Sequence, residues 1–234
     1  MIFDKKSSKH LPNHVAFIMD GNRRWAKIKK LPIIEGHKKG SEVVNKIVKK
    51  SIEFDIKYLT FFSFSTENWN RSYSEILKLQ SLLRFYLESK KQIFIKEQIK
   101  FSFIGDIDKF DPKIKIDIIN LKKITSKFDR LHLTLALNYG SRSEILNALR
   151  VLNQKNAKNI KEEDISKNLM TSDLPDPDFV IRTSGEKRLS NFLLWQIAYS
   201  ELYFTKTLWP DFSTQKYISA LKNYISRKRR FGGD

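Results

Sequence analysis

The sequence predicts a single α/β domain in which helices flank a mostly parallel central sheet. Strand-like apolar runs alternate with helix-like periodic patterns along the chain, as in folds built from a parallel sheet covered on both faces. We find no linker or internal repeat that would divide the 234 residues. Hydrophobic residues make up 41% of the sequence, which is enough for one large core.

The first half of the chain contains two strand signals, each followed by a helix signal. The run 14–19 is short and apolar and ends at the turn residues Asp20-Gly21-Asn22. Apolar residues then keep helical spacing over 41–52. The run 58–64 is rich in aromatic residues, and the leucine-rich stretch 76–87 predicts a long helix after it.

The second half continues the alternation with shorter signals. Strand-like runs occur at 101–104, 131–137, 179–181 and 202–204. Helical patterns are predicted over 144–152, 191–199 and 214–227, and the polar stretch 153–161 is predicted to be a surface loop. We interpret residues 1–13 as an N-terminal arm and residues 14–234 as the domain.

The composition excludes several classes of protein. The chain has no cysteine, which excludes disulfides, thiolate zinc sites, iron–sulfur clusters and cysteine nucleophiles. No apolar run is long enough to predict a membrane span, and the first residues lack the pattern of a signal peptide. We therefore expect a cytoplasmic protein.

The formal net charge of +18 favours anionic partners, such as nucleic acid, an acidic membrane surface or phosphorylated substrates. Only 12 of the 44 basic residues are arginine, and the lysines are scattered as on an ordinary solvated surface. A nucleic-acid-binding protein remains an alternative, but the sequence shows no helix-turn-helix or RNP-like signature, and we expect no nucleic-acid partner. A kinase is disfavoured because neither a P-loop nor a Gly-x-Gly-x-x-Gly motif occurs.

Three polar segments follow predicted strands, at 20–25, 65–71 and 182–188. Ligands of parallel sheets bind at the carboxyl ends of the strands, so these segments predict a site. They contain five of the twelve arginines, which suit phosphate recognition. Asp20 would repel a phosphate unless a cation bridged the two, which points to Mg²⁺. His37, near a predicted helix start, is a further candidate for contact with phosphate.

Six blocks, at 14–26, 36–37, 64–71, 138–140, 181–186 and 189–196, together resemble the cis-prenyltransferases. The resemblance implies an α/β domain with an elongated hydrophobic tunnel. It also implies a homodimeric enzyme that condenses isopentenyl diphosphate onto an allylic diphosphate, with Mg²⁺ as cofactor and a cis double bond in the product. The expected primer is farnesyl diphosphate. The expected product is a long-chain polyprenyl diphosphate, such as the undecaprenyl diphosphate used in cell-wall synthesis. A shorter product and a noncatalytic partner subunit are alternatives.

The resemblance also implies roles for individual residues. Asp20 is expected to handle Mg²⁺ and the primer diphosphate, and Glu201 to supply a second Mg²⁺ carboxylate across the dimer interface. The loop around the primer diphosphate corresponds to Gly21, Asn22, Arg23, Arg24 and Trp25, with His37 nearby. The segment between the two substrates corresponds to Ser65, Thr66 and Glu67, flanked by Trp69 and Arg71.

The remaining implied residues concern the proton, the second substrate and the partner subunit. Asn68 matches a proposed proton acceptor, but an amide is a poor base, so we interpret it as an orienting residue. The clamp on isopentenyl diphosphate corresponds to Arg182, Arg188, Leu189 and Ser190. The tail Arg230-Phe231-Gly232 is expected to reach the partner's site. Ile33 departs from the family, because an arginine is usual there.

The chemistry requires an apolar pocket that keeps water from a carbocation. We expect the long helix to line it, together with two strand residues. These positions are Leu79, Leu82, Leu83, Tyr86, Leu87, Phe62 and Phe64. A peripheral membrane contact would assist release of a long apolar product.

Overall fold

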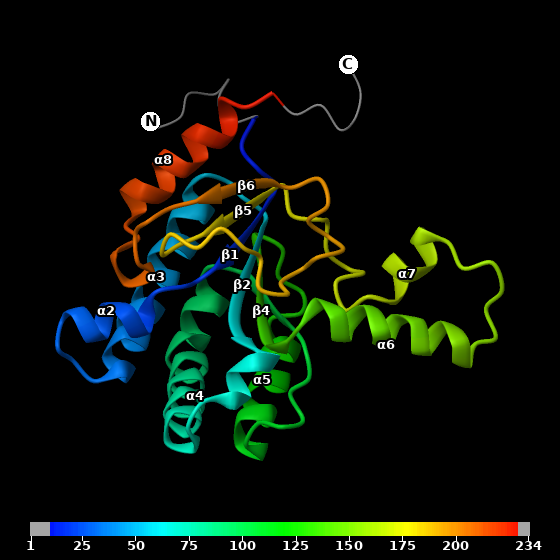
Figure 1. Ribbon diagram of the computed structural model, residues 1–234, viewed down its shortest axis with the longest axis horizontal. Helices are drawn as coiled ribbons and strands as arrows, with labels where there is room; N and C mark the ends of the chain where they lie inside the picture. Colours follow the sequence, from blue (N-terminus) through cyan, green and yellow to red (C-terminus); the bar gives the residue numbers. More distant parts are fainter. Residues whose placement is uncertain (1–9, 229–234) are drawn as a thin grey trace.

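The computed structural model describes residues 10–228, and within them six parallel strands form one sheet (Figure 1). The strand order is β3-β4-β2-β1-β5-β6. The strands are β1 (His14–Ile18), β2 (Tyr58–Ser65), β3 (Ile99–Ile104), β4 (Leu131–Tyr139), β5 (Phe179–Arg182) and β6 (Glu201–Phe204). Every neighbouring pair of these strands is parallel, which confirms the predicted class of sheet.

Helices connect the strands and carry recognisable start signals. They are α2 (Asn22–Ile28), α3 (Ile33–Glu53), α4 (Tyr73–Lys96), α5 (Pro112–Ile124), α6 (Ser141–Gln154), α7 (Glu162–Asn168) and α8 (Thr214–Ile225), with 3₁₀ turns η1 (Thr66–Asn70) and η2 (Trp209–Asp211). Ser72 begins α4 by accepting a hydrogen bond from the backbone N–H of Glu75. Asp111 caps α5 in the same way, and Pro112 follows it at the first helical position.

The sheet separates two apolar clusters. Val15 and Phe17 of β1 point into the larger cluster, which includes residues of α3, α4, α5 and α8. Ala16 and Ile18 point to the opposite face, into a smaller cluster. Because β1 is buried along its whole length, it holds the residue that follows it in a rigid position. Helices α6 and α7 extend sideways from this body (Figure 1).

The predicted helix over 191–199 is wrong. This segment runs through turns and bends, and it carries left-handed backbone conformations at Asn191 (φ 62°) and Leu193 (φ 47°). Left-handed residues cannot continue a right-handed helix. The segment instead places Phe192, Leu193 and Ile197 in the smaller cluster, where each is buried. Burial of these side chains therefore decided the conformation, although their spacing also suits a helix.

Helix α5 is not predicted from the sequence. Isoleucines at 114, 116, 118 and 119 mix the two-residue period of a strand with helical spacing. In the structure Ile114 and Ile118 are buried, while Ile116 and Ile119 face outward.

Two predicted segments lie wholly or partly outside the described residues. They are the N-terminal arm 1–13, of which residues 10–13 are described, and the tail Arg230–Gly232. Within residues 10–228, no helix combines the length and apolar character needed to cross a bilayer.

Candidate active site

The three polar segments converge because their strands are neighbours. In the order β2-β1-β5, the carboxyl ends of β1, β2 and β5 lie side by side at one edge of the sheet. A polar pocket of about 530 Å³ opens there. Its lining includes seven of the predicted residues, namely Asp20, Ser65, Glu67, Asn68, Arg71, Arg182 and Ser190.

Asp20 carries the negative charge at the centre of this pocket. Its Oδ2 lies 3.0 Å from the Nη2 of Arg182 and 3.4 Å from the Nη2 of Arg24. Burial by itself raises the pKa of the Asp20 carboxyl, but the hydrogen bond from Arg182 and the two guanidinium charges outweigh it. The pKa of Asp20 therefore lies below its ordinary value, and the carboxylate is ionised at neutral pH.

Arg182 is the most deeply placed cation of the site. Its side chain is only 4% exposed. Besides Asp20, it donates to the Oγ of Ser190 at 2.8 Å and to the backbone carbonyl of Arg188. These contacts hold one face of the guanidinium fork in a fixed orientation, which is the property that bidentate phosphate recognition needs.

The backbone at the end of β1 is held from both sides. The amide of Asp20 donates to the Oγ1 of Thr183 at 3.0 Å, and the carbonyl of Asp20 accepts from the amide of Trp209 at 3.0 Å. Gly21 follows with φ 115°, a left-handed conformation, and a Cβ there would lie 3.0 Å from Leu208. The glycine is thus required both by the turn and by the close approach of the chain.

The turn η1 forms a second wall of the pocket. Asn68 accepts a hydrogen bond from the backbone N–H of Ser65 at 3.2 Å, so its amide oxygen stabilises the turn. Glu67 accepts a hydrogen bond from the side-chain amide of Asn191 at 3.3 Å. Burial raises the pKa of Glu67, but hydrogen bonds from backbone and side chains lower it below its ordinary value. Glu67 is therefore a weak base.

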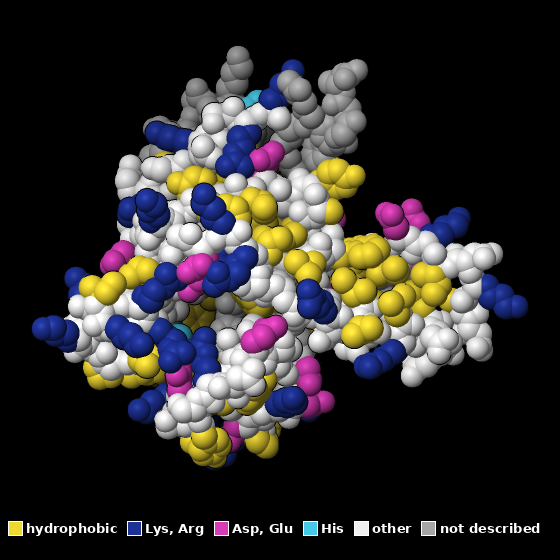
Figure 2. All heavy atoms as spheres, viewed as in Figure 1, with side chains coloured by type: hydrophobic (Ala, Val, Ile, Leu, Met, Phe, Trp, Pro, Cys, Tyr) yellow, Lys and Arg dark blue, Asp and Glu magenta, His cyan; other side chains and the backbone are white. Residues whose placement is uncertain are grey.

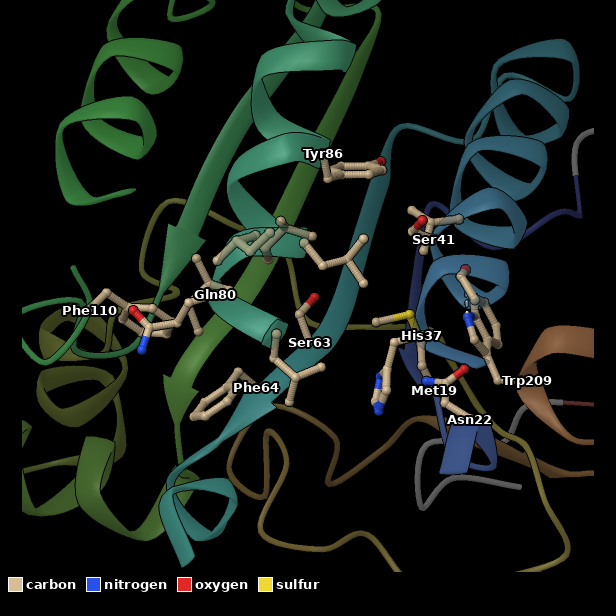
Figure 3. A pocket seen from close by; sticks show the side chains of 17 residues that line it. Met19, Asn22, His37, Ser41, Ser63, Phe64, Gln80, Tyr86, Phe110 and Trp209 are labelled. Carbon is tan, nitrogen blue, oxygen red and sulfur yellow. Dashed lines mark hydrogen bonds between the residues drawn. The ribbon is translucent and has the colours of Figure 1, made fainter. Parts of the chain in front are cut away.

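An apolar pocket adjoins the polar one, and Met19 lines both (Figure 3). Helices α3 and α4 and strands β2 and β4 form its walls. Of the predicted lining residues, Phe64, Leu79, Leu82, Leu83 and Tyr86 are present. Two predicted residues do not line it: Leu87 is buried in the core, and Phe62 stacks on Phe192 and lines the polar pocket instead.

His37 lies where the apolar pocket meets a group of charged residues. It sits in the second turn of α3 and lines the pocket. Burial, together with the charges of Arg71 and Arg23, lowers the pKa of His37 to about 4, so the imidazole is neutral. Both arginines pair with Glu75, at 3.1 Å and 3.6 Å respectively.

Two buried polar atoms at this junction lack hydrogen-bond partners within residues 10–228. They are the Nε2 of His37 and the Oδ1 of Asn22, and both residues line the apolar pocket (Figure 3). Buried polar atoms are normally satisfied, so these two are available to a ligand.

Several predicted residues lie outside the polar pocket. The indole of Trp25 donates to Asp211, and the indole of Trp69 donates to Asn138. Thr66, the first residue of η1, lies against Gly140. Arg188 is 64% exposed and pairs with Glu186, which also lies 3.5 Å from Arg24. Leu189 packs on the smaller apolar cluster.

Glu201 lies at the opposite end of the sheet from Asp20. It begins β6 and is in register with Phe179, whereas Arg182 is in register with Phe204. The Glu201 carboxylate pairs with Arg227 at 2.6 Å. Among the described residues, no cluster of three or more metal-ligating side chains occurs. Within one chain, the carboxylates that line the polar pocket are those of Asp20 and Glu67, and Glu201 does not join them.

The pocket contains two polar residues that the sequence analysis did not include in the site. Arg142, at the start of α6, and Asn191 both line it, and the Asn191 side chain accepts from the Arg142 backbone N–H at 2.9 Å. Arg142 follows β4, and ligands of parallel sheets bind at the carboxyl ends of the strands, so this position was a signal for a site residue. Asn191 had no such signal, because it lies in the segment predicted as a helix.

Fold and site together define an α/β enzyme that holds an ionised carboxylate and several arginines beside an apolar pocket. Residues 18–232 match the family model described as putative undecaprenyl diphosphate synthase. Isoprenyl transferase of Aquifex pyrophilus is 48% identical over 225 residues, covering 96% of this chain and 97% of that protein. The isoprenyl transferase of Thermotoga maritima is 46% identical over 227 residues, covering 95% and 97%.

Solved structures of similar fold come from the same group of enzymes. Lavandulyl diphosphate synthase from Lavandula x intermedia, in complex with dimethylallyl diphosphate, superimposes with a TM-score of 0.92 at 35% identity, covering 96% of this chain and 99% of that one. A probable undecaprenyl diphosphate synthase from Campylobacter jejuni gives a TM-score of 0.80 at 34% identity, covering 94% and 98%. The chain belongs to the undecaprenyl diphosphate synthase family and is a cis-prenyltransferase.

Proposed function

We propose that this enzyme condenses isopentenyl diphosphate with an allylic diphosphate primer in a Mg²⁺-dependent reaction that forms cis double bonds. The observation that carries the proposal is the junction at Met19, where the polar pocket meets the apolar one. A substrate with a diphosphate head and a hydrocarbon tail matches this pair of environments. The similar plant enzyme was solved with dimethylallyl diphosphate, an allylic diphosphate, which supports the substrate class.

Asp20 is the residue that would hold Mg²⁺. In proteins this ion commonly binds one or two carboxylates and completes its shell with substrate phosphates and water. A single ionised carboxylate beside Arg24 and Arg182 fits that mode. When bound, Mg²⁺ supplies charge neutralisation at the departing diphosphate. Glu201 of a second subunit, expected from the family resemblance, remains part of the proposal.

The protein's own contribution is to bind, orient and exclude water. Arg24 and Arg71 would stabilise negative charge as the allylic carbon–oxygen bond breaks and its electron pair moves to diphosphate, while Arg182 would bind isopentenyl diphosphate. The π electrons of isopentenyl diphosphate then form the new carbon–carbon bond. The apolar walls on α3 and α4 keep water from the cation.

We assign the proton lost in the last step to the departing diphosphate. Among the described residues that line the polar pocket, there is no strong base: Asn68 is an amide engaged in the η1 turn, and the pKa of Glu67 is lowered. In this scheme Asn68 orients the turn and does not accept the proton.

We propose a long-chain polyprenyl diphosphate as the product, such as undecaprenyl diphosphate for cell-wall glycan synthesis. The family description and the Campylobacter jejuni relative support this choice. A shorter cis-prenyl product is the alternative.

We further propose a cytoplasmic homodimer with peripheral membrane contact. Hydrophobic side chains gather over α6 and α7, where Leu146 and Leu149 are exposed, and such a face suits a partner subunit (Figure 2). Phe85 and Leu77 are exposed on α4 near Lys78 and Lys90, a combination that suits an acidic lipid surface.

Incubation of the purified protein with farnesyl diphosphate, labelled isopentenyl diphosphate and Mg²⁺ tests the proposal. Label should move into an apolar product, and chelation of the metal should stop the transfer. Chromatography of the product then distinguishes a long chain from a short one. Absence of transfer with every allylic primer tried would refute the proposed function.

A further inference from the structure

The chain that joins α2 to α3 forms an exposed edge in which apolar and basic side chains are neighbours. Residues 27–34 read Lys-Ile-Lys-Lys-Leu-Pro-Ile-Ile. Ile28 is 69% exposed, Leu31 is 43% exposed, and the lysines at 27, 29 and 30 are exposed as well. Figure 2 shows hydrophobic side chains among Lys and Arg side chains over this part of the molecule, beside α2. This composition suits a partner that is both apolar and anionic.

The protein does not neutralise the lysines of this edge. Within residues 10–228, Lys27, Lys29 and Lys30 form no ion pair. Lys38 of α3, in contrast, pairs with Glu35 at 2.7 Å. Uncompensated positive charges this close together favour an anionic partner.

Helix α4 continues the same edge. Its first turns face the start of α3 across a pocket of about 190 Å³, which Ile33, Ile34 and Lys78 help to line. Arg23 of α2 lies 3.6 Å from Glu75 of α4, so α2 reaches the same place. The exposed apolar residues that α4 adds are Tyr73, Leu77 and Phe85. We call residues 27–34, together with these three and Lys78, the apolar–basic edge.

The apolar–basic edge adjoins the space for a hydrocarbon tail. The pocket of about 190 Å³ shares His37 and Leu79 with the apolar pocket of the candidate active site. It shares Ile34 and Lys78 with a groove of about 670 Å³ between α3 and α4, which Leu77 also lines. A series of cavities therefore leads from the apolar pocket to the exposed edge.

We infer that the apolar–basic edge docks on the surface of an acidic lipid bilayer, with Ile28 and Leu31 inserted among the headgroups. This inference rests on the proposed function, because a polyprenyl product needs an apolar destination. A bilayer presents anionic headgroups directly above hydrocarbon, and neighbouring lysine and aliphatic side chains match that combination. Lysine stems lie along the apolar layer while their ammonium groups stay with the lipid phosphates. In this orientation the series of cavities faces the bilayer, and the product leaves without passing through water.

Sedimentation with lipid vesicles tests the docking surface. Wild type should bind vesicles of phosphatidylcholine mixed with phosphatidylglycerol, and bind phosphatidylcholine alone at least about tenfold more weakly. Added salt should weaken the binding to the mixed vesicles. Ile28→Ser combined with Leu31→Ser should lower affinity for the mixed vesicles at least about tenfold, because the inserted apolar surface is lost. Lys27→Gln combined with Lys29→Gln should also lower this affinity and should reduce its salt dependence.

The connection between α6 and α7 supplies matched controls, because it also carries an exposed isoleucine between exposed lysines. Ile160→Ser, and Lys158→Gln combined with Lys161→Gln, remove the same kinds of group on the opposite side of the molecule from α2 (Figure 1). They should leave vesicle binding unchanged. Turnover with a soluble short primer, in the absence of lipid, should stay the same in all of these variants, because none of the substituted residues lines the polar or the apolar pocket.

The outcomes separate the two proposals. Equal vesicle binding by wild type and the edge variants overturns the docking surface, as does failure of wild type to bind the acidic vesicles. If the edge variants change the mass of the protein in solution and leave vesicle binding intact, the edge is a contact between protein chains, and the inference is overturned too. Absence of label transfer by wild type in lipid-free solution refutes the proposed function instead, whatever the vesicles show.

Discussion

Arg182 donates a hydrogen bond of 3.0 Å to the carboxylate of Asp20, although 162 positions separate them in the chain. The pairing of β1 with β5 brings them together, because Ile18 is in register with Arg182 and Asp20 follows two residues later. The pair places a positive fork and a negative group at the bottom of one polar pocket.

Asp20→Ala should lower turnover by about three orders of magnitude or more, equivalent to about 4 kcal/mol or more of lost transition-state stabilisation. The physical reason is loss of the carboxylate that would hold Mg²⁺ against the diphosphate. Initial rates with saturating substrates check this, with thermal unfolding to confirm the fold. Glu186→Gln is a matched control, because Glu186 also pairs with Arg24 but lies outside the pocket. Near-normal turnover of Asp20→Ala would contradict the metal role.

Arg182→Lys should weaken the binding of isopentenyl diphosphate far more than the binding of the primer, because lysine cannot reproduce the guanidinium fork. The same substitution at Arg188 should act in the same direction but less strongly, since Arg188 is 64% exposed. The KM of each substrate, measured separately, is the readout. Arg150→Lys on the outer face of α6 is the control and should change neither value. Equal effects on both substrates would show that the assignment is wrong.

The free energy of unfolding should fall as the pH is lowered from about 6.5 toward 4. Burial lowers the pKa of His14 to about 4, although hydrogen bonding to the Pro175 carbonyl and the charge of Asp178 oppose this. The unfolded chain then binds the proton first, so the stability present above the ordinary pKa of 6.5 is lost with acid. For His14 the loss between pH 7 and pH 5 should be about 2 kcal/mol.

Denaturant titration at several pH values measures this dependence. His14→Gln should reduce the slope of stability against pH, whatever its stability at neutral pH. His37 and His132 also have a pKa lowered to about 4, chiefly by burial, so a smaller slope should remain. An unchanged slope in His14→Gln would contradict the prediction.

Removal of residues 230–234 should cut activity at least about tenfold, or about 1.4 kcal/mol, if the tail completes a partner's site. These residues lie outside the described part of the chain, and the prediction comes from the family resemblance. Mixing the truncated chain with full-length Asp20→Ala tests it. Activity should recover, because an intact Asp20 site can receive an intact tail. No recovery, with mixed dimers confirmed by mass, would refute sharing between subunits.

Local patterns predicted the strands well, because apolar alternation and turn residues report directly on burial and chain reversal. The run 14–19 and β1 differ by one residue. The helix predicted over 191–199 is wrong because local spacing does not report contacts with distant parts of the chain. Its apolar residues are compatible with a helix, and only contact with the smaller cluster favours the left-handed turns at Asn191 and Leu193.

The sequence by itself determined the α/β class and the presence of polar residues after the strands, because both depend on neighbours along the chain. Tertiary structure decided which of those residues meet. Strand order brings Asp20, Arg182 and η1 into one pocket, and parallel register sends Glu201 to the far end of the sheet. Helix packing decided that Tyr86 of α4 is buried beside Ser41 of α3, since its periodicity is that of any core residue.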